Sequence, residues 1–286
     1  MLALERAQID VDRYVAYEID KYATSVSKKH HQQIEHMGSV VGADFTRYAG
    51  FDLLIGGSPC QDLSIAKSGR SGLDGSQSGL FYEYARALRE VNPKYFLLEN
   101  VASMSRHDRQ VISDILGVEP IMINSSLVSA QQRKRLYWTN IPNVTQPEDK
   151  CIVLSNILLD DVDHDVSPVS ADVCYNSSVS STEPTFRPCR VGQIGKGGQG
   201  DRVYGIYGKS VSLSANGGGR GAKTGLYKIG DSVRKLHPIE CERLQTLPDG
   251  YTAGISDTQR YKCIGNGWTV DVIAHILSHM KGGRPW

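Results

Sequence analysis

The thiol of Cys60 is the first candidate for chemistry in this chain, because the stretch that carries it, "FDLLIGGSPC", ends an apolar run in a stiff turn. The run over 51–55 is too short for a helix and apolar enough for a strand buried on both faces, as in a parallel sheet. Gly56 and Gly57 permit a sharp turn, and Pro59 stiffens the loop. Open α/β sheets place reactive groups on such loops, where neighbouring groups can turn a thiol into a nucleophile. A small buried hydrophobic residue is the alternative explanation for a lone cysteine.

A carboxyl group and two guanidinium groups form the second set of candidates. Glu99 ends the apolar run "YFLLE", where its carboxyl group could donate to a ring nitrogen of a substrate, and Asn100 follows it. Arg133 and Arg135 lie two residues apart in "QQRKRLYW". On a strand they would share one face and could hold one anion. A solvated strand end and a solvated basic edge are the alternatives.

Strands alternate with helical patterns over the first half of the chain. The expected helices cover 2–7, 25–37 and 80–91, with another after residue 99, and the expected strands cover 14–18, 51–55, 95–99, 121–124 and 135–140. This alternation predicts βαβ units in an α/β fold with a doubly wound, mostly parallel sheet. Three strands end at or near a reactive residue, namely Glu18, Cys60 and Glu99. One end of the sheet should therefore collect the chemistry.

The alternation ends near residue 145, where the composition changes. Residues 148–172 hold seven acids and one lysine, whereas 187–235 hold ten lysines and arginines and two acids. Glycine-rich pieces alternate with short strand-like pieces such as "RVYGIYG" and "SVSLSA". We expect a small, loop-rich, β-type insert with a basic face over 145–232.

The last stretch, 233–286, is helical again and should rejoin the first domain, 1–144. Its apolar residues fall on one face of a helix; they are Val270, Ile273, Ala274 and Leu277. The chain is thus expected to hold one α/β domain interrupted by the insert.

Composition sets broad limits on the class of protein. The chain has 286 residues and a formal net charge of +1, which neither requires nor excludes a nucleic-acid partner. Its six cysteines are spread without a C-x-x-C pair, so neither a disulfide framework nor a zinc site is indicated. The start carries no signal-peptide pattern, and no stretch is long enough to span a bilayer. These features predict a soluble protein of a reducing cytoplasm.

Five short motifs occur in a recognisable order: "GGSPC", "ENV", "QQRKR", "HPIECERLQTLPDGY" and "GNGWTV". Together they resemble the DNA (cytosine-5) methyltransferase family, with its bacterial, phage and de novo eukaryotic members. The resemblance runs from residue 1 to about 281 and is weakest over 145–232. It implies a Rossmann-like class I methyltransferase fold, S-adenosylmethionine as cofactor and double-stranded DNA as partner.

The resemblance gives catalytic roles to Cys60, Glu99, Arg133 and Arg135. Cys60 would be the nucleophile that adds to C6 of a cytosine and makes C5 able to accept a methyl group. Glu99 would contact N3 and the exocyclic amine, stabilising the charge that develops on the ring. The two arginines would hold the base and the attacking loop. Because a stacked base cannot be attacked, the cytosine would be flipped out of the duplex.

The resemblance also implies a donor site. The matching residues are Glu18, Ile19, Asp44, Phe45, Pro59, Leu80, Asn266 and Trp268. Glu18 would hold the ribose hydroxyls, and Ile19 would pack on the adenine. Asp44 and Phe45 would lie at the adenine edge and on its face. A simple strand-end carboxylate is the alternative for Glu18.

The insert would be the target-recognition region of this family. Its Arg202, Arg220 and Lys223 could contact phosphates or guanine edges, while an exposed flexible linker is the competing explanation for its glycines. The resemblance further implies a bacterial or phage-infected cell and a possible cognate restriction endonuclease.

The chain departs from the family pattern at its start. The family opens with a strand and a Phe-x-Gly-x-Gly-like loop that cradles the methionine end of the donor, whereas Met1 stands where that loop would pass into the first helix. A doubly wound sheet that begins with a helix likewise lacks its first strand. We expect weak donor binding and slow or absent turnover, with Met1 either internal to a longer reading frame or the start of a natural fragment.

Three other classes are considered. A cysteine hydrolase would need His107, His237 or His275 as a base near the thiol. An ATPase is suggested by "GGGRGAKT", which nearly matches a P-loop. The third class is a methyltransferase-like DNA-binding or regulatory subunit that has lost its donor site.

Overall fold

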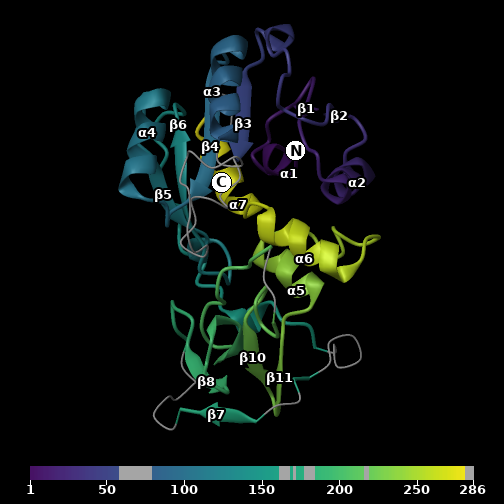
Figure 1. The fold of residues 1–286 in the computed structure, drawn as a ribbon, viewed down its shortest axis with the longest axis vertical. Coiled ribbons are helices and arrows are strands. Elements are labelled where there is room, and N and C mark those ends of the chain that lie inside the picture. Colours follow the sequence, from purple (N-terminus) through teal and green to yellow (C-terminus); the bar gives the residue numbers. More distant parts are fainter. Residues whose placement is uncertain (58–78, 161–167, 170–171, 177–183, 216–218, 281–286) are drawn as a thin grey trace.

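The computed structural model describes residues 1–57, 79–160, 168–169, 172–176, 184–215 and 219–280. Figure 1 shows an α/β region at one end of the molecule and a β-rich region at the other, with the helices α5, α6 and α7 between them. Within the described residues, no helix combines the length and the apolar character needed to cross a membrane.

The α/β region is built on a four-stranded sheet of order β3-β4-β6-β5. Its strands are β3 (Leu53–Gly57), β4 (Tyr95–Val101), β5 (Ile121–Asn124) and β6 (Lys134–Thr139). β3 and β4 pair in parallel, and β6 is antiparallel to both β4 and β5, so three of the four strands run in one direction. The predicted mostly parallel α/β sheet is confirmed.

Helices cover both faces of this sheet. The central strand β4 is apolar on both faces, so each face needs a helical layer to bury it. Leu98 packs with α3 (Leu80–Val91) and α4 (Arg106–Leu116) in one cluster. Leu97 points the other way and packs with α7 (Val270–Ser278). Both leucines are fully buried, as the two-residue period of a strand requires. α1 (Leu2–Arg6) contributes to the second cluster, so the sheet is doubly wound.

A second, two-stranded sheet lies beside the first. Its strands β1 (Val15–Ala16) and β2 (Glu35–His36) pair in parallel and are joined by α2 (Lys21–His30). The prediction of a helix over 25–37 is wrong at both ends. α2 begins earlier because the side chain of Asp20 accepts hydrogen bonds from the first-turn N–H groups of Tyr22 and Ala23. It ends at His30 because residues 35–36 pair with β1.

β3 is an edge strand, contrary to the prediction of a strand buried on both faces. Among the described residues its partner is β4 alone. Leu53, Leu54 and Ile55 are therefore half-buried, whereas every residue of β4 is buried. The apolar run 51–55 does predict a strand, which is shifted to 53–57.

The β-rich region holds a five-stranded sheet of order β11-β10-β9-β8-β7. The strands are β7 (Val173–Tyr175), β8 (Arg190–Ile194), β9 (Arg202–Tyr204), β10 (Leu226–Ile229) and β11 (Ser232–Arg234). A small core that includes Val203 and Leu226 supports it. The strand expected in "SVSLSA" is not formed; Ser210 makes only an isolated bridge with Gln131.

The return segment forms α5 (Pro238–Leu244), α6 (Asp257–Asn266) and α7. The predicted apolar face of α7 is buried, with Ile273, Ala274 and Leu277 at most 2% exposed. At the start of the segment, Arg234 donates two hydrogen bonds of 2.8 Å to the carboxylate of Glu240, and both residues are buried. Short 3₁₀ turns lie at Thr46–Tyr48, Ser125–Leu127, Leu154–Asn156 and Gln199–Asp201.

Candidate active site

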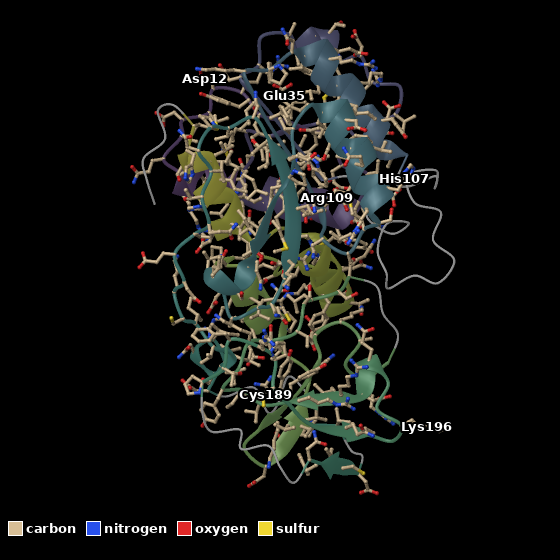
Figure 2. All side chains as sticks on the ribbon, turned by 90° about the vertical axis from the view of Figure 1, so that its left-hand side faces the viewer. Asp12, Glu35, His107, Arg109, Cys189 and Lys196 are labelled. Carbon is tan, nitrogen blue, oxygen red and sulfur yellow. The ribbon has the colours of Figure 1, made fainter. Side chains whose placement is uncertain are left out.

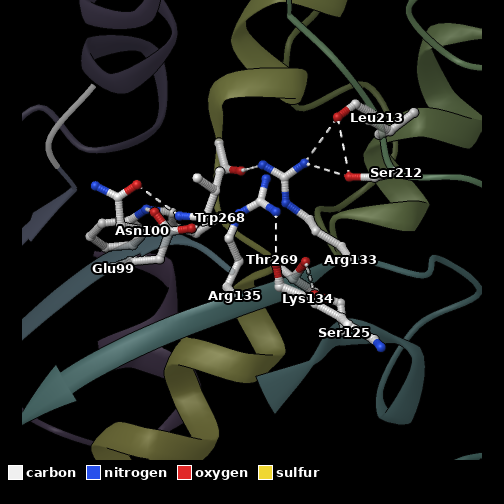
Figure 3. A network of polar contacts seen from close by, with 12 residues as sticks. Glu99, Asn100, Ser125, Arg133, Lys134, Arg135, Ser212, Leu213, Trp268 and Thr269 are labelled. Carbon is white, nitrogen blue, oxygen red and sulfur yellow. Dashed lines mark hydrogen bonds and ion pairs between the residues drawn. The ribbon is translucent and has the colours of Figure 1, made fainter. Parts of the chain in front are cut away.

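The carboxylate of Glu99 is held from two sides (Figure 3). Its Oε1 lies 2.8 Å from Nε of Arg135, and its Oε2 accepts a hydrogen bond of 3.1 Å from the indole Nε1 of Trp268. Glu99 is on β4 and Arg135 on β6, two antiparallel neighbours, so the ladder sets their spacing. Residue Glu99 is 9% exposed. The side chain is thus fixed in one direction before any substrate arrives.

The end of β3 completes this side of the site. Gly57 pairs in register with Glu99. A Cβ atom built on Gly57 would lie 3.0 Å from Nε1 of Trp268, so the indole rests directly against the backbone there. Glycine at this position lets the indole reach the carboxylate.

Cys60 and Pro59 lie outside the described residues. The sequence places Cys60 three residues after Gly57. In the described part of the chain, β3 ends beside Glu99. The role of Cys60 as nucleophile stays a prediction.

Arg133 and Arg135 have different surroundings, although both guanidinium groups lie in the same view (Figure 3). Arg133 is 4% exposed and donates hydrogen bonds of 3.0–3.1 Å to the carbonyl oxygens of Leu213, Gly265 and Gly267. It precedes β6 and joins the insert to the α6–α7 turn. Of the two arginines, Arg135 contacts the carboxylate of Glu99, whereas the hydrogen bonds of Arg133 to the backbone go to carbonyl oxygens.

A buried polar network behind the site was not predicted from the sequence. The side chain of Gln245 donates to the carbonyl oxygens of Ile264 (2.9 Å) and Gly267 (3.0 Å), and it accepts from the hydroxyl of Thr269 (2.7 Å). Gln131 donates to Gln245 at 3.3 Å. These contacts fix the turn that carries Trp268. In the sequence, Gln131 and Gln245 lie 114 residues apart, and nothing in their spacing predicts that they meet.

The first group of predicted donor residues lies around the ends of β1 and β2. Glu18 and Ile19 are exposed, Ile19 by 79%. Tyr17 packs edge-on against Phe45 with ring centroids 5.4 Å apart, which brings the segments of Glu18 and Asp44 together. Glu18 and Asp44 therefore offer carboxylates, and Ile19 an apolar surface, on neighbouring segments.

Phe45 differs from its predicted role. It is 3% exposed, and the guanidinium carbon of Arg86 lies 4.5 Å from its ring centroid. Its N–H donates to the carboxylate of Glu90 at 3.1 Å. The ring face expected to stack on adenine is covered in this structure.

Of the remaining predicted donor residues, Trp268 contacts Glu99. Leu80 is half-buried at the first position of α3. Asn266 is exposed at the end of α6, and Trp268 lies in the turn that follows. Trp268 thus lies against the end of β3, and the roles of Leu80 and Asn266 stay predictions.

Two other cysteines are poor nucleophiles. Burial raises the pKa of the Cys263 thiol to about 11, with the nearby carboxylate of Asp20 as the next cause. Burial also raises the pKa of Cys241, which is fully buried. Both thiols stay protonated at neutral pH.

The predicted DNA contacts lie together on the insert. The N–H of Gly221 donates to the carbonyl of Gly200 at 2.9 Å, which joins the segments of Arg202, Arg220 and Lys223. Arg202 and Arg220 are exposed, and Lys223 is half-buried. Arg220 lies 3.4 Å from Asp201. Figure 2 shows this end of the molecule at the bottom, where Lys196 extends from the same insert.

The alternatives from the sequence gain no support from the described residues. Nδ1 of His237 accepts from the N–H of Ile239 at the start of α5, and Nε2 of His275 lies 2.9 Å from the carbonyl oxygen of Thr145. His107 is exposed on α4 (Figure 2). Lys223 is followed by the strand β10, whereas a P-loop lysine is followed by a helix.

Known proteins resemble this chain in sequence over almost its whole length. The profile of the family described as "C-5 cytosine-specific DNA methylase" matches residues 1–282. The type II methyltransferase M.HhaI of Haemophilus parahaemolyticus is 33% identical over 279 residues, which cover 91% of this chain and 84% of that protein. The type II methyltransferase M.NlaX of Neisseria lactamica is 28% identical over 300 residues, which cover 98% of this chain and 92% of that protein.

Solved structures agree in fold. The Entamoeba histolytica methyltransferase EhMeth superposes with a TM-score of 0.71 at 16% identity, covering 97% of this chain and 92% of that one. The S. pombe Dnmt2 methyltransferase superposes with a TM-score of 0.64 at 17% identity, covering 97% and 93%.

Proposed function

Because the chain belongs to the C-5 cytosine-specific DNA methylase family, we propose that it transfers a methyl group from S-adenosylmethionine to C5 of a flipped cytosine in duplex DNA, through a covalent bond between Cys60 and C6. The observation that supports this most directly is the fixed carboxylate of Glu99 beside the end of β3. A carboxyl group held on both oxygens is suited to recognising one edge of a planar base.

The proposed chemistry uses the chain's residues in order. The Cys60 sulfur, after losing its proton, forms a bond to C6 while the C5–C6 π electrons move toward C5. The carboxyl group of Glu99 donates a proton to N3 and accepts a hydrogen bond from the exocyclic amine, so it neutralises the negative charge that develops on the ring. Once C5 has gained the methyl group it loses its proton to solvent, and the C6–S bond breaks to restore the C5–C6 double bond and the free cysteine. Arg135 keeps the Glu99 carboxylate in place, and Arg133 acts as a positioning residue because its hydrogen bonds go to backbone carbonyls. Extrusion of the base gives the sulfur access to C6.

The donor would be held by the residues around the end of β3. S-adenosylmethionine, when bound, supplies an electrophilic methyl group. Glu18, Ile19 and Asp44 suit its adenosine part, because two exposed carboxylates and an exposed apolar side chain lie on neighbouring segments. Asn266 and Trp268 would close the side toward Glu99, with Leu80 and Pro59 as further contacts and Phe45 supporting them from the core.

We further propose that donor binding and turnover by this chain are weak. The support is a space between β1 and β3, where a cavity of about 500 Å³ separates the two sheets beside the residues assigned to the donor. A methyltransferase-like DNA-binding or regulatory subunit is the second candidate, and the same open space favours it.

We assign the rest of the chain in the same terms. Residues 145–232 form the target-recognition region, with Arg202, Arg220 and Lys223 contacting double-stranded DNA. Residues 1–144 and 233–286 form the catalytic domain. We propose that the protein acts in the cytoplasm of a bacterial or phage-infected cell, with a cognate restriction endonuclease as a possible partner.

A duplex that contains 5-fluorocytosine, together with S-adenosylmethionine, tests the reaction. The 5-fluorine blocks the last step, so an active chain gives a covalent protein–DNA adduct that survives denaturing electrophoresis, and Cys60→Ser gives none. Adduct from Cys60→Ser would refute the assignment of the nucleophile. DNA binding without any adduct would identify the subunit class instead. A donor dissociation constant below about 1 μM by calorimetry would refute weak donor binding.

A further inference from the structure

Lys209 is a buried lysine that the proposed chemistry does not use. It lies in the insert, between β9 and β10, and is 1% exposed. Burial of an ammonium group costs free energy unless its hydrogen-bonding capacity is met. The contacts of this side chain must therefore offset that cost.

The ammonium group of Lys209 meets three backbone carbonyl oxygens. Nζ donates to the carbonyls of Ser126 at 2.6 Å, Ser129 at 3.2 Å and Ile152 at 2.6 Å. An ammonium group has three N–H donors, so this set uses all of them. Burial lowers the pKa of Lys209, and the nearby carboxylate of Asp149 acts in the opposite direction. A neutral amine has two N–H donors, so only the protonated form can serve all three carbonyls.

The three carbonyls belong to different parts of the chain. Ser126 and Ser129 lie in the loop between β5 and β6 of the α/β region. Ile152 lies in the segment by which the chain enters the insert. One positive charge thus joins the interior of the insert to its entry segment and to a loop of the catalytic domain.

The backbones of the two regions also pair at this point. The loop between β5 and β6 reaches the insert (Figure 1), where Ser210 and Gln131 form an isolated parallel bridge. The N–H of Ser210 donates to the carbonyl of Ala130 at 2.6 Å, and the N–H of Gln132 donates to the carbonyl of Ser210 at 3.0 Å. Lys209 therefore stands next to a direct backbone connection between the insert and the catalytic domain.

A second buried cation crosses the same boundary in the opposite direction. Arg133, from the catalytic side, donates to the carbonyl of Leu213 in the insert at 3.0 Å. An apolar cluster that includes Ala130 and Tyr204 also spans the boundary. Apolar contacts tolerate sliding, whereas hydrogen bonds to defined carbonyls fix one register. The two cations therefore set the position of the insert.

The boundary lies between two proposed sites. Gln131 is shortly before Arg135, which holds the carboxylate of Glu99. Lys209 is shortly after Arg202, an exposed residue that we assign to DNA. A shift at the boundary would change the position of one site relative to the other.

We propose that Lys209 is a positioning residue, whose ammonium group locks the insert to the α/β region and so fixes the DNA-contacting face of the insert relative to Glu99. An apolar side chain of similar length would fill the volume but would leave three buried carbonyls without their donor. The part that concerns DNA rests on the proposed function, whereas the lock itself does not.

Hydrogen exchange of Lys209→Met in the full chain tests the lock without reference to activity. The amides at the boundary, those of Ser210 and Gln132, should exchange about tenfold faster or more. The amides of Gly205, within the insert, and Ile112, within α4, should change by less than about threefold. Lys228→Met, at an exposed lysine of β10, should change none of them. Equal acceleration at all four amides, or acceleration at none, would overturn the proposal.

Chemical rescue tests whether the charge or the volume matters, and it also serves if Lys209→Met does not fold. Lys209→Ala lacks the part of the side chain that n-propylammonium reproduces, so this ion, present during refolding, should restore slow exchange at Ser210 and Gln132. 1-Propanol at the same concentration has the same stem but no charge and one donor, and it should not. Equal rescue by both compounds, or rescue by neither, would contradict a lock made by the ammonium group.

The consequence for DNA is measured with the 5-fluorocytosine duplex. At saturating duplex, Lys209→Met should form adduct about tenfold more slowly, because the bound base is no longer held in register with Glu99. Its dissociation constant for the duplex should stay within about threefold of that of the parent, because Arg202 and Arg220 remain exposed. Weaker DNA binding with an unchanged adduct rate at saturation would overturn the positioning role. If the parent forms no adduct, the proposed reaction fails, and the exchange and rescue results decide the lock alone.

Discussion

On the β6 side of β4, Glu99 has both carboxylate oxygens bound, and the arginine next to it in space is bound as well. On the other side of β4, β3 ends a sheet whose edge faces a cavity of about 500 Å³. The same strand, β4, is buried along its whole length, whereas its neighbour β3 is half-buried. The side of β4 that carries the Glu99 contacts, the closed side, is therefore preorganised, and the edge of β3 that faces β1, the open side, is not.

Methyl transfer to a base has two requirements, stabilisation of charge on the ring and binding of the methyl donor, and they concern different sides of the α/β region. A preorganised carboxylate costs little reorganisation when charge develops on a bound ring. An open edge beside the residues proposed to hold the donor would cost affinity, because part of the donor's surroundings must be ordered on binding. We therefore expect base chemistry to depend on single residues of the closed side, and donor affinity to depend on how the open side is filled.

Replacement of Glu99 should give the largest effect. Glu99→Gln keeps the shape of the side chain but replaces the carboxyl group, which can pass a proton to N3, by an amide that cannot, so the rate of adduct formation with a 5-fluorocytosine duplex should fall about 100-fold or more. The measurement is a time course of adduct on denaturing gels. Glu119→Gln, at an exposed carboxylate 3.8 Å from Arg109, should leave the rate unchanged. A rate within twofold of the parent for Glu99→Gln would remove Glu99 from the mechanism.

Replacement of Arg133 should mainly lower stability. Arg133→Met leaves the carbonyls of Leu213, Gly265 and Gly267 without their buried charged donor. The free energy of unfolding in urea should fall by about 3 kcal/mol. Arg202→Met, at an exposed arginine, should change it by less than about 0.5 kcal/mol. If Arg133→Met kept full stability but lost adduct formation, Arg133 would act on the substrate directly.

Gly57→Ala tests whether the open edge and the closed side are coupled. The added methyl group would lie 3.0 Å from Nε1 of Trp268, so the indole must shift and its hydrogen bond to Glu99 should weaken. Loss of one such bond corresponds to about a fivefold lower adduct rate, since a neutral donor contributes about 1 kcal/mol. Gly198→Ala, where the nearest atom would be 3.7 Å away, is the matched control. An unchanged rate would show that the indole position does not matter.

The elements predicted well from the sequence are those whose pattern is local. The helix at 80–91 and the strand at 121–124 have the predicted bounds, because their amphipathic or apolar periods are uninterrupted. α2 was misplaced because its start depends on one capping residue, Asp20, within a polar stretch. Glu99 and Arg135 were both predicted as site residues, but their contact depends on the pairing of β4 with β6.

Properties that depend on distant partners could not be predicted. The apolar run that forms β3 does not reveal whether it has one partner strand or two, because apolar residues suit both cases. Arg133 looks like a surface arginine in "QQRKR", but its partners lie 80 and more residues away in the chain. Trp268 likewise reaches a carboxylate 169 residues away. The structure supplies these pairings, and they are what distinguishes the closed side from the open one.

The smallest expected effect concerns pH on the open side. His31 lines a cavity of about 340 Å³ and is 8% exposed, and burial lowers its pKa, with the nearby N-terminal amine and His30 acting in the same direction. Glu5, 3.3 Å from Nδ1, acts in the opposite direction but less strongly than burial. The folded protein therefore binds a proton at His31 less readily than the unfolded chain does. As pH falls below the ordinary histidine value of about 6.5, the unfolded chain takes up more protons, so the free energy of unfolding falls.

Thermal unfolding at pH 7.5 and pH 5.5 measures this effect against a matched variant. His31→Gln keeps a polar side chain but cannot titrate, so its Tm should fall less over this range than that of the parent, by about 2 °C. His107→Gln, at an exposed histidine on α4, should fall as much as the parent does. Equal decreases for His31→Gln and the parent would show that His31 titrates alike in the folded and unfolded chain, and that the wall of this cavity is as hydrated as an open surface.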